Sequence, residues 1–167
     1  GVSISLSSEV FPEIKEYERV STTVVNAYVR PVVEKYLTNL ETRLKEAGFA
    51  GSVLIILSHG GVAPIPEAIR LAAATVLSGP AGGVAGSRHG SALIGAKDLV
   101  PFDMGGTSTD ISMIVDSKPG LSTTRGIAGQ RIALQSLDIA SIASGGGSIA
   151  SVDSGGLLKV GPESAGA

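Results

Sequence analysis

Asp103-Met104-Gly105-Gly106-Thr107-Ser108-Thr109-Asp110 is the stretch that decides the fold of this chain. An apolar run at 99–102 precedes it, and 111–115, where small or polar residues alternate with apolar ones, follows it. Two strand-like runs joined by a turn that contains glycine predict a β-hairpin. The expected turn carries two glycines, three hydroxyl groups and a carboxylate at each end.

This turn has the residue types that a metal-assisted phosphate site needs. Glycine allows close approach of the backbone and positive φ angles, so N–H groups can converge on an anion. A carboxylate in the same turn would repel a bare phosphate unless a cation lay between them. Mg²⁺ takes one or two carboxylates beside phosphate oxygens and water, so the residues suggest a site for the phosphates of a Mg²⁺-bound nucleotide. The alternative is an ordinary hairpin in which Asp103 and Asp110 are solvated.

Composition limits the classes of function. The 167 residues include 43% hydrophobic and 17% charged residues, which favours a packed core over disorder. A net charge of −2 and an aromatic content of 4% argue against nucleic-acid binding. Cysteine is absent, which excludes disulfides and thiolate sites in this sequence and fits a cytoplasmic protein. No apolar run reaches the ~18 residues that span a bilayer, so no membrane association is expected.

The first third of the chain reads as one long packing helix. Residues 2–6 alternate in polarity and predict a short strand before it. Helical periodicity then runs from 16 to 47, with Pro31 expected to kink or divide the helix and Gly48 to end it. The apolar stripe expected to face the core comprises Val25, Tyr28, Val32, Tyr36 and Leu40.

A β-branched apolar run at 51–57 predicts a strand buried on both faces. It ends at the loop Ser58-His59-Gly60-Gly61, and in open α/β sheets ligands gather at the carboxyl ends of strands. His59 is therefore a candidate acid/base or hydrogen-bonding residue, or else a loop imidazole whose bonds the backbone satisfies. A short helix is expected at 67–76.

A second helix is expected at 79–95, rich in small residues. Glycine inside a helix costs about 1 kcal/mol relative to alanine, so its glycines need a compensating reason. Close packing, a hinge, or a nucleotide lying against Gly82 and Gly83 would each supply one.

The region after the central hairpin predicts short strands and turns. Turns are expected at 118–120 and 126–129, strands at 121–124 and 131–134, and a last hairpin at 151–160 followed by a loop. The run Gly145-Gly146-Gly147-Ser148 would either cap a nucleotide or form a flexible turn. The motifs G-x-x-x-x-G-K-[ST], G-x-S-x-G and G-x-G-x-x-G are absent, so neither that class of phosphate loop, nor a nucleophile elbow, nor a dinucleotide fingerprint is supported.

The order of these elements resembles the actin-like ATPase superfamily, in which a helix crosses between two similar halves and a D-x-G-G hairpin opens the second. More narrowly, the chain resembles the hydantoinase A / 5-oxoprolinase family, including subunits of acetone and acetophenone carboxylases. Five ordered runs carry this resemblance: 16–28, 78–84, 103–110, 145–150 and 161–167.

The resemblance implies an α/β fold of the actin-like (ribonuclease H-like) type, present in part. Residues 1–78 would form the end of the first half, 79–97 the crossing helix and 98–167 the start of the second half. Since the chain begins at Gly1 and lacks an earlier D-x-G-G hairpin, we expect a segment of a longer subunit that is inactive alone. The activity implied is ATP- and Mg²⁺-dependent phosphorylation of a carbonyl oxygen, in a cyclic amide or a ketone, within a hetero-oligomer.

The resemblance also implies a role for each part of the hairpin. Asp103 would bind Mg²⁺ directly or through water, and Asp110 would orient a water or the metal's other ligands, or cap the turn. The N–H groups of Gly105, Gly106 and Thr107 would hold phosphate oxygens, with the hydroxyls of Thr107 and Thr109 as further donors. The candidate catalytic residues are Asp103, Asp110 and His59; the candidate cofactor-binding residues are Gly105, Gly106, Thr107, Ser108, Thr109, Gly82, Gly83, Gly145 and Gly146.

Two positions depart from the family pattern. The family often has Asn where this chain has His59, and often has His after Leu-Asp-Ile, where this chain has Ala140. The second departure puts a catalytic role for that position in doubt here. The alternatives are another actin-like ATPase or sugar kinase, and a non-catalytic scaffold of the same fold.

Overall fold

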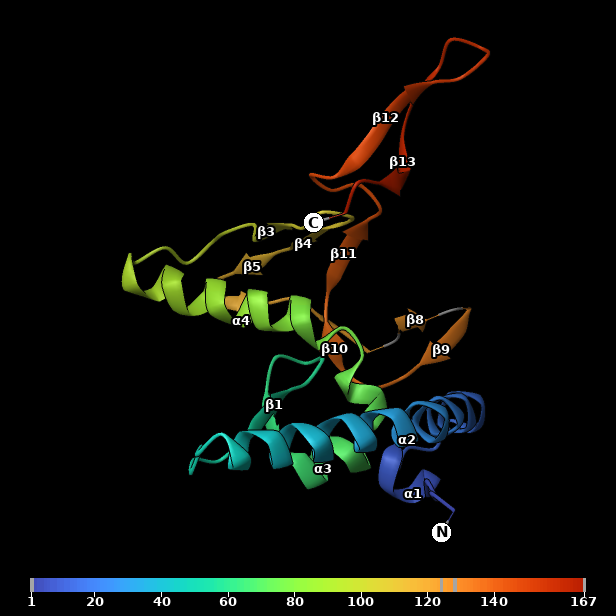
Figure 1. Cartoon of the computed structure of the whole chain (residues 1–167), viewed down its shortest axis with the longest axis vertical. Coiled ribbons are helices and arrows are strands. Elements are labelled where there is room, and N and C mark those ends of the chain that lie inside the picture. Colours follow the sequence, from blue (N-terminus) through green and yellow to red (C-terminus); the bar gives the residue numbers. More distant parts are fainter. Residues whose placement is uncertain (1, 124, 128, 167) are drawn as a thin grey trace. The chain divides into compact units, whose positions relative to one another are not determined.

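The computed structural model describes residues 2–123, 125–127 and 129–166. The fold is mixed α/β (Figure 1). The chain divides into two compact units. Unit 1 comprises residues 1–82 and 121–137, and unit 2 comprises 83–120 and 138–167. Helix α4 (Ser78–Leu93), predicted at 79–95, begins in unit 1 and ends in unit 2. Among the described residues, no helix is both long and apolar enough to cross a membrane.

Unit 1 is built on helix α2 (Glu16–Glu46), which confirms the long helix expected at 16–47. Acidic residues lie in its first turn and Arg43 and Lys45 in its last, which suits the helix dipole. The helix continues through Pro31 without division, and Gly48 adopts a φ of +86° just beyond its end. Residues 2–6 form no strand; the short helix α1 (Ser7–Val10) follows them, and the Ile4 carbonyl accepts a hydrogen bond from Arg30 of α2 instead.

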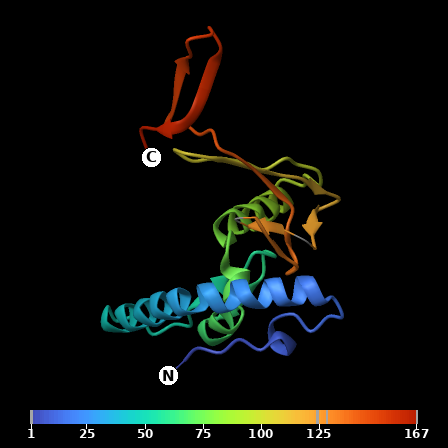
Figure 2. The ribbon, with the colours of Figure 1, turned by 90° about the vertical axis from the view of Figure 1, so that its right-hand side faces the viewer.

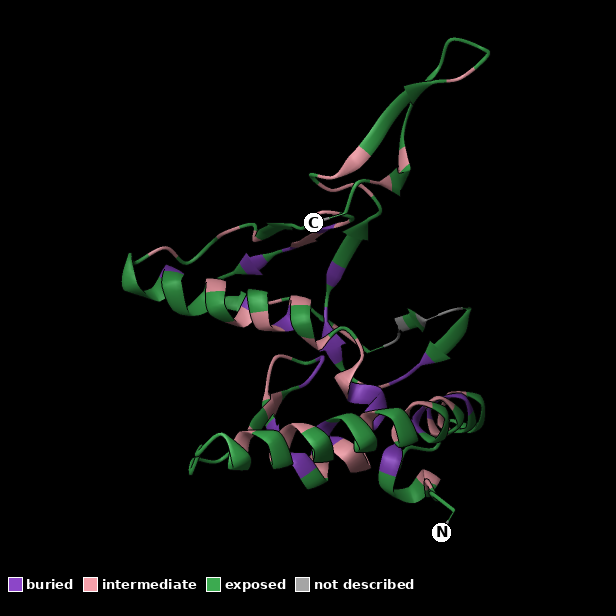
Figure 3. Ribbon diagram, in the orientation of Figure 1, coloured by how far each residue is buried: buried purple, intermediate pink, exposed green. Residues whose placement is uncertain are grey.

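The apolar stripe predicted for α2 is confirmed at Leu40, which packs against the core, and is wrong at its three middle positions. Tyr28, Val32 and Tyr36 are 83%, 73% and 64% exposed. The buried face instead carries Thr22, Asn26 and Leu37 (Figure 3). Two of these side chains are polar, and their hydrogen bonds rather than their hydrophobicity determine which side of the helix is covered.

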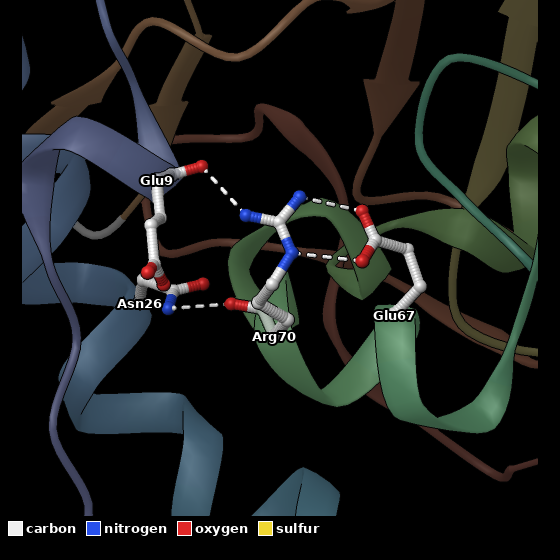
Figure 4. A network of polar contacts seen from close by, with 4 residues as sticks. All are labelled: Glu9, Asn26, Glu67 and Arg70. Atoms are coloured by element: carbon white, nitrogen blue, oxygen red, sulfur yellow. Dashed lines mark hydrogen bonds and ion pairs between the residues drawn. The ribbon is translucent and has the colours of Figure 1, made fainter.

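Asn26 joins α2 to the two short helices that pack against it, α3 (Ile65–Arg70) and the 3₁₀ helix η1 (Ala72–Thr75). Its Oδ1 accepts a hydrogen bond from Ala73 N at 2.9 Å, and its Nδ2 donates to Arg70 O at 3.1 Å and to Ser5 Oγ at 3.0 Å. Figure 4 shows the bond to Arg70 beside the paired contacts of Glu67 with the Arg70 guanidinium. That guanidinium hydrogen bond lowers the pKa of the Glu67 carboxyl.

A β-hairpin follows α2: β1 (Leu54–Ile56) pairs antiparallel with β2 (Val62–Pro64). The expectation of a strand buried on both faces is wrong, because Leu54 and Ile56 are 56% and 39% exposed. The strand has one partner, and one side of the hairpin packs on the core. That core contains six buried residues: Leu37, Leu57, Ala63, Ile65, Ala68 and Ala74.

Two small antiparallel pairs complete unit 1. Strand β7 (Leu121–Ser122) pairs with β10 (Ser136–Leu137), and β8 (Arg125–Ile127) pairs with β9 (Gln130–Ile132). The helix predicted at 67–76 is divided into α3 and η1. The turn predicted at 126–129 includes Ala128, which lies outside the described residues.

Unit 2 contains a three-stranded antiparallel sheet in the order β11-β4-β3. Strand β3 (Phe102–Met104) and β4 (Thr109–Ser112) form the hairpin predicted from the sequence, and β11 (Ile139–Ile142) pairs with the other edge of β4.

Two further hairpins lie in unit 2. Strand β5 (Ile114–Val115) pairs with β6 (Lys118–Pro119). The turn predicted at 118–120 is wrong, because the chain reverses at Asp116 and Ser117, both with positive φ. Strands β12 (Ser148–Val152) and β13 (Leu158–Ser164) lie side by side (Figure 2) and confirm the last hairpin, although β13 continues where a loop was expected.

Replacing Asn26 by Ala should destabilise the protein by about 2–4 kcal/mol, because the buried Ala73 N–H and Arg70 carbonyl both lose a partner. The matched control is Asn39→Ala, an exposed position on the same helix, which should change little. Urea unfolding followed by circular dichroism measures both. Equal midpoints for the two variants would show that the Asn26 bonds do not hold α2 in place.

Candidate functional site

The predicted hairpin brings two carboxylates face to face. Asp103 of β3 is the direct cross-strand partner of Asp110 of β4, so both side chains lie on the same face of the sheet. Side chains so placed have Cβ atoms about 4.5–5.5 Å apart, and like charges there repel. Asp103 is exposed and Asp110 half-buried. No lysine or arginine forms an ion pair with either carboxylate within the described part of the chain.

A hydroxyl group extends this pair to a row of three cross-strand partners, Asp103, Asp110 and Ser141. Ser141 of β11 is the cross-strand partner of Asp110 on its other side, and its Oγ donates a hydrogen bond to Asp110 Oδ1. Sequence reasoning missed Ser141, since only the pairing of β11 with β4 places it there. Gly83 of helix α4 lies near the Asp103 end of the row: a Cβ on Gly83 would lie 3.6 Å from Asp103 Oδ2.

The tip of the hairpin offers fewer free amides than the sequence suggested. The Gly105 N–H donates to Ser108 O at 2.9 Å, so it closes the turn and is not available to a phosphate. The amides of Gly106 and Thr107 have no hydrogen-bond partner among the described residues. The Thr107 side chain is exposed and Ser108 is half-buried. Two consecutive amides therefore remain at the tip.

The run Gly145-Gly146-Gly147 supports this turn through its backbone. Gly146 N donates to Gly105 O at 2.9 Å and Gly147 N donates to Gly106 O at 2.8 Å. Gly145 N donates to Ser148 Oγ at 2.8 Å. A Cβ on Gly145 would lie 2.5 Å from Gly105 O, which is closer than real atoms approach. All three amides thus have internal partners, and the run positions the turn instead of capping a nucleotide through them.

Thr109 also has a supporting part. The residue is 3% exposed, and its Oγ1 donates to Ser144 O at 2.6 Å. This bond ties β4 to the segment that leads into the glycine run. Since its hydroxyl proton is already donated, Thr109 is not a free donor for a phosphate oxygen in this structure.

Two predicted site residues lie in unit 1. A Cβ on Gly82 would lie 3.0 Å from Ile56 Cδ1, so close packing against β1 explains this helical glycine. His59 sits in the turn of the β1–β2 hairpin, where its Nδ1 accepts a hydrogen bond from Gly61 N at 3.1 Å. The geometry is that of an exposed loop imidazole with a backbone partner.

A pocket of about 200 Å³ lies against the same sheet of unit 2. Ile111 and Ala140 line it, and both alternate with Asp110 and Ser141 along their strands, so they face away from the carboxylates. Ala140 thus belongs to the opposite face of the sheet from Asp103.

The row fits a divalent cation that takes only some of its ligands from the protein. Within the described ranges no three or more His, Cys, Asp or Glu side chains gather as a metal cluster. Mg²⁺ does not require one, since it binds through one or two carboxylates and fills its other positions with phosphate oxygens and water. Two opposed carboxylates beside two free amides meet that requirement.

Residues 19–167 match the family model described as hydantoinase/oxoprolinase. The chain belongs to this family. It is 36% identical over 166 residues to the caprolactamase subunit alpha of Pseudomonas jessenii, covering 99% of the chain and 24% of that relative. It is 40% identical over 167 residues to 5-oxoprolinase 1 of Arabidopsis thaliana, covering 98% of the chain and 13% of that relative.

A solved structure has the same fold as this member of the hydantoinase/oxoprolinase family. The nucleotide-free structure of acetone carboxylase, from a study of ATP-dependent acetone carboxylation, matches with a TM-score of 0.81 at 30% identity. The match covers 96% of this chain and 22% of the other. The chain thus spans about a quarter or less of the length of these relatives.

Replacing Gly145 by Ala should lower stability by about 1–3 kcal/mol, because the new methyl group would overlap Gly105 O and push the glycine run off the turn. Gly146→Ala is the matched control, since its Cβ would meet nothing closer than Gly105 O at 3.8 Å. Thermal unfolding of both variants provides the measurement. A Gly145→Ala midpoint no lower than that of Gly146→Ala would contradict the packing described here.

Proposed function

We propose that this chain supplies the Mg²⁺–phosphate site of an ATP-dependent enzyme that activates a carbonyl group by phosphorylation. The observation that carries the proposal is the opposed pair Asp103 and Asp110, next to the unpartnered amides of Gly106 and Thr107. Phosphoryl transfer depends chiefly on positioning and on stabilisation of negative charge, and this hairpin is suited to both.

Each group in the hairpin has a proposed part. Asp103, which is exposed at the end of the row, binds Mg²⁺ directly or through water. Asp110 orients a water or another ligand of the metal. The amides of Gly106 and Thr107, with the Thr107 and Ser108 hydroxyls, bind phosphate oxygens. When bound, Mg²⁺ neutralises phosphate charge that the two carboxylates would otherwise repel. Gly105, Thr109, Gly145 and Gly146 keep the turn in shape through their own hydrogen bonds.

The relatives suggest the kind of substrate. Their names include a caprolactamase, 5-oxoprolinases, and acetone and acetophenone carboxylases. Hydrolysis of a cyclic amide and carboxylation of a ketone both start from a weakly reactive carbonyl, which phosphorylation of its oxygen would activate. We therefore propose a cyclic amide or a ketone as substrate. Several relatives are named as subunits, which favours a hetero-oligomer.

The place of the chain in the actin-like fold is likewise a proposal. Residues 1–78 would end the first half, 79–97, which include most of α4, would cross between halves, and 98–167 would open the second half. The contacts group 121–137 with unit 1 rather than with the rest of 98–167.

The test uses the natural gene product that contains this sequence, with any subunits that purify with it. Asp103→Asn should reduce Mg²⁺-dependent ADP formation in the presence of hydantoin, 5-oxoproline or an aryl ketone by about 100-fold, since the variant lacks the charge that binds the metal. The matched control is Asp116→Asn, an exposed carboxylate in the β5–β6 turn at a positive φ that Asn tolerates.

Coupled-enzyme detection of ADP measures both variants, and circular dichroism checks their folding. If Asp103→Asn keeps the activity of Asp116→Asn, the hairpin is not the metal site. If the unsubstituted protein forms no ADP with any of these substrates, the non-catalytic scaffold is the better account.

A further inference from the structure

The row of cross-strand partners runs from Ser141 through Asp110 to Asp103, across all three strands of the sheet in unit 2. Since cross-strand partners share a face, the hydroxyl, the middle carboxylate and the outer carboxylate lie in line. Asp110 alone has a cross-strand partner on both sides. Its neighbours differ in kind, one a hydrogen-bond donor and the other a like charge.

The hydrogen bond from Ser141 Oγ engages one oxygen of the Asp110 carboxylate, Oδ1. An ionised carboxylate accepts at two oxygens, so Oδ2 remains for another ligand. The bond also restricts rotation of the Asp110 side chain. Ser141, which lies on the other side of Asp110 from Asp103, thus fixes the orientation of the Asp110 carboxylate.

Folding stability does not explain this arrangement. Ser141 is exposed and Asp110 half-buried, and a hydrogen bond so placed competes with water and adds little to stability. Thr109, next to Asp110, shows the contrast: it is buried and its hydroxyl ties β4 to Ser144 O. Carboxylates that bind a metal commonly accept a hydrogen bond from a neighbouring residue, which orients them.

We propose that Ser141 is a positioning residue for the metal–phosphate site, acting through Asp110. This inference rests on the proposed function, because it assigns Ser141 to the same cation. It requires a hydroxyl at position 141, so threonine should replace serine while alanine and cysteine should not, cysteine being of similar size but a weak donor.

The experiment measures metal binding without turnover. The natural gene product is titrated with Mn²⁺ in the presence of ADP and without carbonyl substrate, and free Mn²⁺ is followed by electron paramagnetic resonance. Ser141→Ala and Ser141→Cys should raise the apparent Kd for Mn²⁺ about tenfold. Ser141→Thr should stay within about twofold of the unsubstituted protein. The matched control is Ser151→Ala, an exposed serine on β12, which should leave the Kd unchanged.

The outcomes separate the two proposals. An unchanged Kd for Ser141→Cys, with Mn²⁺ binding lost in Asp103→Asn, overturns the role of Ser141 and leaves the metal site standing. An unchanged Kd in Asp103→Asn as well overturns the proposed function itself. Should Ser141→Ala unfold, Ser141→Cys decides, because it preserves the volume of the side chain. Equal weakening by Thr and Cys would also contradict the proposal, since a hydroxyl would then not be the group that matters.

Discussion

Backbone contact between the glycine run 145–147 and the turn after β3 is the constraint on which unit 2 depends. Two peptide N–H groups of the run donate to the carbonyls of Gly105 and Gly106, with no room for a side chain at Gly145. These bonds use carbonyl groups on the turn and leave the Gly106 and Thr107 amides without partners in the described structure. Hydrogen bonds from a segment distant in sequence therefore hold a short turn whose two free amides are available to an anion.

The same sheet creates an electrostatic conflict that a bound cation would resolve. Asp103 and Asp110 are register partners, and no described lysine or arginine pairs with either. An isolated hairpin could avoid this repulsion by rotating one side chain into solvent. The hydrogen bond from Ser141, on the other side of Asp110 from Asp103, fixes one oxygen of the Asp110 carboxylate. Retention of an unfavourable pair at a surface is physically reasonable where function supplies the missing positive charge.

The sequence predicted the features that local chemistry controls. Glycine turns and helical periodicity gave the central hairpin, the last hairpin, α2 and α4, and the five family runs identified the family. It did not predict the buried side of α2, because Thr22 and Asn26 are polar and are buried through their hydrogen bonds. Nor did it predict the use of Thr109 and Gly145 as supports, or the place of Ser141. Those depend on pairing between strands far apart in the chain, which periodicity does not reveal.

The central claim is that the Asp103 end of the carboxylate row binds a metal ion that carries nucleotide phosphates. Anomalous diffraction at the manganese edge, from crystals of the natural gene product grown with Mn²⁺ and a non-hydrolysable ATP analogue, tests it most directly. The account predicts a manganese peak within coordination distance of the Asp103 carboxylate or of a water bound to it, with phosphate oxygens at the Gly106 and Thr107 amides. A nucleotide bound elsewhere, with Asp103 and Asp110 both free of metal, would contradict it.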